Sequence, residues 1–226
     1  MKIHQLIKWL KNIRFQLFYS LITRKGIPLV TLGGECQWTI LDQTLQSSSL
    51  VLCAGAGHDI SFEKTLIQRY GCTVVLLDPS PTGIATVQKE AVPENLLKFH
   101  PIGLAGTDCL VNFDEPADTS EGSFRGNKTQ NPSVIQFPCK SISTLLSELQ
   151  WPRIDLLKID IEGFEYDVLK DILINKLDVR QICVEFHYGK HFNHSRFEMI
   201  QCILALRKAG FDLVHQTHFD HTFVRR

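Results

Sequence analysis

Side chains that can transfer protons follow two apolar stretches of the sequence. Asp160 and Glu162 come directly after the run LLKI, and Glu185 and His187 follow the later run ICV. Residues i and i+2 of an extended segment lie on the same side, so each pair presents both of its members to one face. If the two stretches are neighbouring parallel strands, carboxylates and an imidazole meet at one edge of a sheet. Such a group is suited to general acid–base catalysis.

Roles can be assigned to these side chains from their chemistry. We expect His187 to be the base, because the pKa of an imidazole lies nearest to working pH. Glu162 is an alternative base, Glu185 is expected to orient His187, and Asp160 is expected to face a cofactor or to position the acceptor. The structural alternative is that Glu162 and Glu165 cap the helix that follows, because acids stabilise the first turn of a helix.

A cluster of histidines near the end of the chain invites a metal interpretation. No HExxH motif and no CxxC pair accompanies it, so we expect no metal and assign these histidines to the surface or to supporting contacts. An ion held by Asp160, Glu162 and His187 is the less favoured alternative. The cluster contains His187, His191, His194, His215, His218 and His221.

A second group of candidate residues follows an earlier apolar stretch, at 49–54. Gly55 and Gly57 remove side chains at this point, so that backbone N–H groups can approach a ligand closely. Asp78 follows the next apolar stretch and lies 21 residues after Gly57. That is about the spacing at which an acid binds the ribose hydroxyls of a nucleotide cofactor. The two strand ends therefore predict a cofactor site.

The choice of cofactor depends on the residues after Gly57. A dinucleotide fingerprint has a third glycine where this chain has Ile60, and Asp59 precedes it. An acid at this place repels a pyrophosphate, whereas it can pair with the ammonium or face the sulfonium of S-adenosylmethionine. An NAD-dependent oxidoreductase is therefore disfavoured. The structural alternative for Asp59 is a capping residue in a tight turn.

The elements that must position these residues alternate along the chain. Alternating strands and helices predict an α/β fold with a mostly parallel sheet. The last two strands, at 211–217 and 222–224, are too close in sequence for a parallel crossover, so they should form an antiparallel pair. The other predicted strands cover 49–54, 73–77, 96–104, 109–113, 154–159 and 181–186, and the predicted helices cover 59–70, 82–91, 141–149, 164–174 and 196–209.

Several of these segments resemble one known family. The chain is similar to the FkbM-type methyltransferases over about residues 30–226, most specifically in LLKIDIEGFEYDVL. The family commonly has Asp-x-Gly in its first motif, where this chain has Cys53-Ala54-Gly55, which leaves Asp59 as the acid there. The other matching segments are VLCAGAGHDISFE, LLDPSP, PIGLAG, ICVEFH and GGECQWTI.

The resemblance implies a fold, a cofactor and a reaction. The fold is the Rossmann-like class I methyltransferase fold, a seven-stranded sheet closed by the antiparallel pair. The cofactor is S-adenosylmethionine, and the reaction is O-methylation of a hydroxyl or carboxyl on a sugar, a polyketide, a lipid or a similar small molecule. A non-catalytic module that binds S-adenosylmethionine is the alternative. The residues expected to contact the cofactor are Cys53, Gly55, Gly57, Asp59, Asp78, Pro79, Gly103 and Asp160.

Composition limits the partners. The net charge is zero and no Asn-Pro-Pro-Tyr or Asp-Pro-Pro-Tyr motif is present, so a nucleic-acid substrate is not expected. Seven cysteines, an odd number without a CxxC pair, favour reduced thiols in the cytoplasm. The polar stretch at 115–133 is long enough to be a lid or a disordered insertion.

The first 30 residues form a basic arm ahead of the domain expected over 31–226. Residues 1–34 carry six cations and no acid. A helical wheel places Leu17 and Leu21 on an apolar face, whereas Phe15 and Tyr19 lie outside it. The arm is too polar to span a bilayer. We expect a helix packed across the domain; the alternatives are peripheral membrane contact through residues 1–24 or a lid over the active site.

Overall fold

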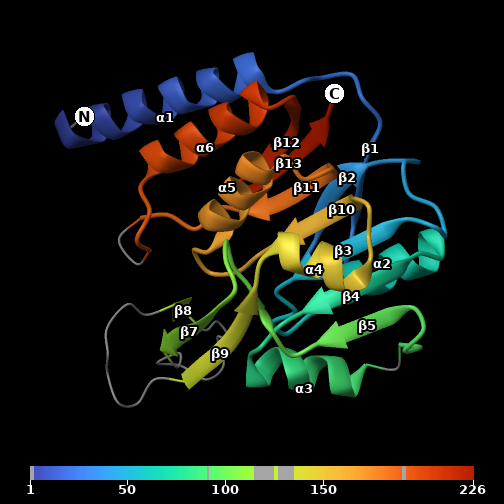
Figure 1. Cartoon of the computed structure of the whole chain (residues 1–226). Helices are drawn as coiled ribbons and strands as arrows, with labels where there is room; N and C mark the ends of the chain where they lie inside the picture. Colours follow the sequence, from blue (N-terminus) through green and yellow to red (C-terminus); the bar gives the residue numbers. More distant parts are fainter. Residues whose placement is uncertain (1–2, 91, 115–124, 127–134, 190–191) are drawn as a thin grey trace.

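The computed structural model describes residues 3–90, 92–114, 125–126, 135–189 and 192–226. Its centre is one seven-stranded sheet (Figure 1). The strands are β3 (Leu50–Ala54), β4 (Thr73–Leu77), β5 (Leu97–His100), β10 (Ile154–Ile159), β11 (Val179–Glu185), β12 (Phe211–Thr217) and β13 (Asp220–Arg225). Their spatial order is β12-β13-β11-β10-β3-β4-β5, and in this sheet β13 runs antiparallel to both of its neighbours while the other pairs are parallel. The predicted α/β fold, with its antiparallel C-terminal pair, is confirmed.

Helices cover both faces of this sheet. The apolar runs of β3, β4 and β10 are buried on both sides, as expected for central parallel strands. The side chains of α2 and α3 pack in one core cluster, and those of α4, α5 and α6 pack in the cluster on the opposite face. The bounds of these helices are α2 (Ser61–Tyr70), α3 (Pro81–Lys89), α4 (Ile142–Leu149), α5 (Glu165–Asn175) and α6 (Arg196–Lys208).

The N-terminal helix α1 (Ile3–Ile22) lies beside α6 (Figure 1). Its contact face matches the predicted one only in part: Phe18 of the predicted face packs on the domain, but so do Phe15 and buried Tyr19, while Leu17 and Leu21 are 55% and 82% exposed. The helical-wheel prediction misplaced part of the contact face, because aromatic side chains, rather than the leucines, fit the surface beside His221. The Nε2 atom of His221 lies 2.6 Å from the Tyr19 hydroxyl. In the described part of the chain, no helix has the length and hydropathy that crossing a bilayer requires. Membrane contact through residues 1–24 stays a prediction.

Two smaller sheets accompany the central one. The predicted strand at 96–104 is divided into β5 and β6, because the chain turns between His100 and Ile102. Strand β9 was not predicted, and the loop at 115–133 lies outside the described residues except for 125–126. The elements of these sheets are β1 (Leu29–Leu32), β2 (Trp38–Leu41), β6 (Gly103–Leu104), β7 (Cys109–Asp114), β8 (Arg125–Gly126) and β9 (Ile135–Lys140).

Candidate active site

The loop after β3 is shaped by Asp78, at the end of β4. One oxygen of Asp78, Oδ2, accepts hydrogen bonds from the backbone N–H groups of Ala56 (2.7 Å) and Gly57 (3.1 Å). The other, Oδ1, accepts one from Ser80 N at 2.8 Å. Asp78 was predicted from the sequence to bind a ribose. In the structure its carboxylate holds two strand-end loops together, and it also lines the cavity between them.

Gly55 allows the ends of β3 and β10 to meet. Its φ is +92°, and a Cβ placed on it would collide with the carbonyl oxygen of Asp160. Asp160 N in turn donates to Ala54 O at 3.0 Å. A glycine is therefore required here both for its left-handed backbone and for this close approach. The approach brings the predicted cofactor edge directly against the predicted catalytic edge.

Asp59 fastens the start of α2 to the segment before β2. Its Oδ2 accepts hydrogen bonds from Cys36 N (2.9 Å) and from the Ser61 hydroxyl (2.7 Å), and its Oδ1 accepts one from Ser61 N (2.7 Å). Burial raises the pKa of Asp59, but these hydrogen bonds outweigh that effect and hold the pKa below its usual range. Asp59 is thus a charged carboxylate at the rim of the cavity. It forms a tight turn with Ser61, but it is not the cap of α2, because the N-cap position is Ile60.

A cavity of about 130 Å³ lies between these loops. The structure brings seven of the eight predicted cofactor residues into its wall: Gly55, Gly57, Asp59, Asp78, Pro79, Gly103 and Asp160. The exception is Cys53, which is fully buried in the core. Burial, and then the nearby Glu63 carboxylate, raise the pKa of the Cys53 thiol. The Cys53 side chain therefore belongs to the core rather than to the cavity.

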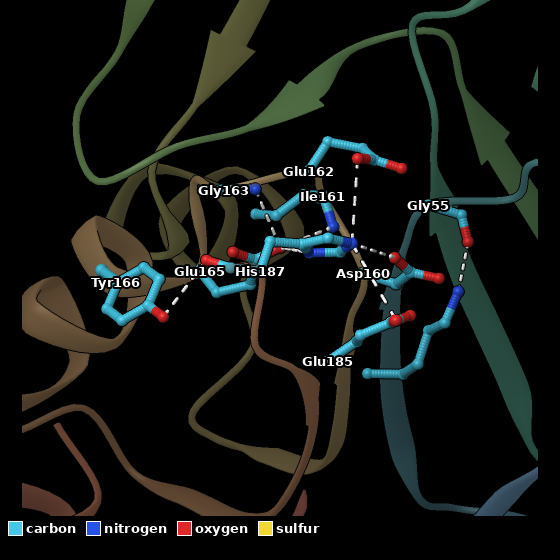
Figure 2. A network of polar contacts seen from close by, with 10 residues as sticks. Gly55, Asp160, Ile161, Glu162, Gly163, Glu165, Tyr166, Glu185 and His187 are labelled. Carbon is cyan, nitrogen blue, oxygen red and sulfur yellow. Dashed lines mark hydrogen bonds and ion pairs between the residues drawn. The ribbon is translucent and has the colours of Figure 1, made fainter. Parts of the chain in front are cut away.

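The predicted catalytic residues also converge (Figure 2). The side chains of Asp160, Glu162 and Glu185 point toward the imidazole of His187. The distances from His187 Nε2 are 3.9 Å to Asp160 Oδ1, 3.8 Å to Glu162 Oε2 and 4.0 Å to Glu185 Oε1. Glu162 reaches this position through a left-handed backbone conformation with φ of 55°, which lies ahead of α5. It therefore does not occupy the first turn of the helix that it was considered to cap.

The residue that orients His187 is Glu165, not Glu185. Oε1 of Glu165 lies 2.7 Å from His187 Nδ1 and accepts hydrogen bonds from the N–H groups of Ile161 and Gly163, both at 3.1 Å. Glu165 is completely buried. The sequence did show an acid in the first turn of α5, but that signal equally fits a helix cap. Its contact with His187 depends on how α5 sits beside β11.

The surrounding acids control the charge of His187. Burial alone lowers its pKa, but the hydrogen bond and charge of Glu165, followed by the charges of Glu162 and Glu185, raise it to about 9. Burial and the neighbouring Asp160 carboxylate raise the pKa of Glu185 well above its usual range. His187 thus carries a proton at neutral pH among these residues, which differs from the near-neutral pKa on which its predicted role as base depended.

A second, wider cavity of about 550 Å³ adjoins the first. It lies between the β1–β2 turn and the hairpin of β12 and β13, and Asp160 and Cys36 line both cavities. Glu185 and Asp220 provide further acids in its wall, and burial and the Asp160 charge raise the pKa of Asp220 to about 6. The sequence did not place Trp38, His215 or Asp220 at a cavity. Trp38 was noted only within the matching segment GGECQWTI and His215 only as a clustered histidine, and Asp220 was not noted.

One buried cation supports the boundary between the cavities. Lys158 lies on β10, its ammonium donates to the carbonyl of Gly55, and it sits 5.6 Å from the centre of the Trp38 ring. Burial lowers its pKa, but the charges of Glu63 and Asp160 raise it overall, so Lys158 stays charged. No sequence pattern pointed to Lys158, because a single lysine within an apolar strand has no recognisable role.

Comparison with solved structures returns proteins of low sequence identity, among them methyltransferases. A Methanococcus jannaschii fibrillarin pre-rRNA processing protein is 9% identical with a TM-score of 0.45, and the match covers 80% of this chain and 67% of that one. A human methyltransferase 10 domain containing protein is 11% identical (TM-score 0.45; 79% and 72%). The N-terminal domain of human METTL16 in complex with SAH is 12% identical (TM-score 0.42; 79% and 62%). TM-scores below 0.5 do not support a conclusion about function, and the strand order of the sheet was established without these comparisons.

No curated protein matches the chain. A family model described as the Methyltransferase FkbM domain matches residues 41–213. The matched region includes the Gly55 loop and Asp78. It also includes His187 and the four acids around it, which are Asp160, Glu162, Glu165 and Glu185. Because it also takes in more than half of the 226 residues, this chain belongs to the FkbM methyltransferase family.

Proposed function

We propose that this S-adenosylmethionine-dependent methyltransferase transfers the methyl group to an oxygen of a sugar, a lipid or another small molecule. The observation that carries the proposal is the position of Asp160, which lines both cavities. The smaller cavity, with its glycine loop, suits the methyl donor, and the wider one suits the acceptor. A donor and an acceptor placed in them would meet beside Asp160, as an in-line displacement requires.

The wall of the smaller cavity fits a cationic cofactor. Besides Lys158, its charged members are the carboxylates Asp59, Asp78, Asp160 and Glu162. Their negative potential favours the ammonium and sulfonium of S-adenosylmethionine and opposes the pyrophosphate of a dinucleotide. When bound, S-adenosylmethionine supplies a methyl group activated by the sulfonium. The same charges argue against the NAD-dependent oxidoreductase.

The acceptor hydroxyl must lose its proton as it attacks. Because His187 holds a proton at neutral pH, we assign the base to the alternative, Glu162, whose carboxylate lines the donor cavity and points toward the same cluster. Asp160 would position the acceptor oxygen, and the buried walls around both residues would exclude water. A base that is placed in this way contributes about 10²–10⁴-fold to the rate.

The cofactor is tested by thermal unfolding with S-adenosylhomocysteine, S-adenosylmethionine and NAD in turn. A ligand at about 100 times its dissociation constant adds roughly 2.7 kcal/mol, which raises the melting temperature by about 5–10 °C in a domain of this size. We expect a rise with the two adenosyl compounds. A rise with NAD alone would contradict the proposal.

The acceptor atom is tested with S-adenosylmethionine labelled with ¹³C in its methyl group. A set of sugars, glycolipids and hydroxy acids is offered, and the products are examined by NMR. A labelled methoxy signal that disappears with Glu162→Gln supports O-methylation and the assigned base. Binding without turnover on any acceptor would instead favour the non-catalytic binding module, and an N-methyl or C-methyl product would refute the oxygen acceptor.

A further inference from the structure

Three potential metal ligands converge from the ends of two neighbouring strands. Asp160 follows β10, Glu185 ends β11, and His187 lies two residues beyond Glu185. One ligand atom of each lies within 4.8 Å of the others. The distances from His187 Nε2 to the two carboxylates, 3.9 Å and 4.0 Å, are too long for hydrogen bonds. Ligands at about 2.0–2.2 Å from a shared ion lie roughly 3–4 Å from one another, so the spacing suits a common cation.

Glu165 provides a second, independent indication. It holds His187 Nδ1 at 2.7 Å and is itself fixed by two backbone N–H groups. A histidine that ligates a metal characteristically donates its other ring nitrogen to a carboxylate in this way, which fixes its tautomer. A metal ion would displace the proton on Nε2, because a ligating histidine is neutral. With Nδ1 held by Glu165, the freed Nε2 lone pair of this nine-tenths buried ring would face Asp160, Glu185 and Glu162 (Figure 2). An accidental cluster of surface acids would lack this buried support.

We propose that Asp160, Glu185 and His187 bind a divalent transition-metal ion. One imidazole and two carboxylates suit Mn²⁺, Fe²⁺ or Zn²⁺ better than Mg²⁺, which prefers oxygen ligands throughout. The sequence, which has no recognised metal motif, led to the opposite expectation. Asp160 lies 25 residues before Glu185 and 27 before His187, so only the parallel pairing of β10 and β11 brings the three together.

The position of the ion indicates what it would do, and this part rests on the proposed function. Asp160 and Glu185 line the wider cavity, so the remaining coordination positions face the acceptor. The acceptor class is therefore one with two neighbouring oxygens, such as a vicinal diol or an α-hydroxy acid, that can both coordinate. Coordination makes the hydroxyl more acidic.

The methyl-transfer step balances without a redox change. The proton of the hydroxyl passes to Glu162, and an oxygen lone pair forms the new O–CH₃ bond. The C–S bond breaks, and its electron pair stays on sulfur, which becomes a thioether. The ion keeps its oxidation state throughout.

The test measures metal binding directly. The full chain is treated with a chelator, dialysed and titrated with Mn²⁺, and free Mn²⁺ is followed by electron paramagnetic resonance. We expect saturation at about one ion per chain, and an affinity lowered by at least about tenfold in Asp160→Asn and in Glu185→Gln. Glu165→Gln, which leaves all three ligands in place, should also weaken binding by about 10–100-fold. The control is Asp212→Asn. Asp212 lies at the start of β12, at the edge of the sheet opposite the proposed metal site.

The outcomes separate this inference from the proposed function. The inference is wrong if neither Mn²⁺ nor Zn²⁺ saturates the protein, or if both ligand variants, shown by circular dichroism to be folded, bind Mn²⁺ as the wild type does. If S-adenosylhomocysteine still raises the melting temperature in that case, the proposed function stands. If Mn²⁺ binds at these residues and no adenosyl compound does, the metal site stands and the proposed function fails.

Discussion

Glu165 and His187 form a buried pair in which Oε1 and Nδ1 lie 2.7 Å apart. The two residues come from α5 and from the segment after β11, and the pair joins a helix to the catalytic edge of the sheet. Because Glu165 also accepts hydrogen bonds from Ile161 and Gly163, it fixes the turn that carries Glu162. One carboxylate therefore sets the position of both the imidazole and the proposed base.

This relationship predicts a large cost for removing the Glu165 carboxylate. Glu165→Ala leaves two backbone N–H groups and a buried imidazole without their acceptor, so we expect the free energy of unfolding to fall by about 3 kcal/mol. Urea denaturation at pH 7 measures it. The matched control is Glu148→Ala, an exposed glutamate on α4, which should change the value by less than about 1 kcal/mol. Equal effects of the two substitutions would show that the Glu165–His187 pair does not stabilise the folded protein.

The two glycines of the cofactor loop should respond differently to alanine. At Gly55 a Cβ meets the Asp160 carbonyl, whereas at Gly57 it meets nothing within 4 Å, although both residues have positive φ. Gly57→Ala should cost only the backbone strain of about 1–2 kcal/mol. Gly55→Ala should cost more and should also abolish the thermal shift with S-adenosylhomocysteine, because the two strand ends must separate. Similar melting temperatures for the two variants would contradict the close approach.

Stability should fall in acid because of His221. Burial lowers the pKa of this histidine to about 4, whereas the unfolded value is about 6.5. The folded state therefore resists protonation, and the stabilisation present above pH 6.5 is lost as the pH falls toward 4, by up to about 3 kcal/mol. Urea denaturation at pH 7.5 and at pH 4.5 measures the loss. His221→Gln should show a smaller loss; an identical loss would place the acid sensitivity elsewhere.

The hydroxyl of Tyr19 should stabilise the attachment of α1. It lies 2.6 Å from His221 Nε2 in a buried contact, so Tyr19→Phe should lower the free energy of unfolding by about 1–2 kcal/mol. The control is Leu21→Ala on the same helix, where the side chain is 82% exposed and the expected change is small. Thermal and urea unfolding of both variants measure the two changes in stability. A larger effect at Leu21 would mean that the predicted apolar face, not the observed one, is used.

Elements with a local sequence signal could be predicted without the structure. The apolar runs of β4 and β10 were predicted with their observed bounds. The helix predicted at 141–149 differs from α4 only at Ser141, which is the N-cap and accepts a hydrogen bond from Thr144 N. The residues that follow these strands were found for the same reason: parallel strands end at one edge, so strand-end acids and glycines must gather there.

Which of these strand-end side chains contact one another depends on the packing of the whole fold. The partner of His187 is Glu165 rather than Glu185, because a left-handed turn at Glu162 and Gly163 folds the start of α5 back against the imidazole. The buried face of α1 and the shared position of Asp160 between two cavities likewise depend on surfaces from distant segments. Hydrophobic periodicity and helix-capping patterns depend on residues that are close together in the sequence. These contacts instead join residues that are 22 to about 200 positions apart, so no local pattern predicts them.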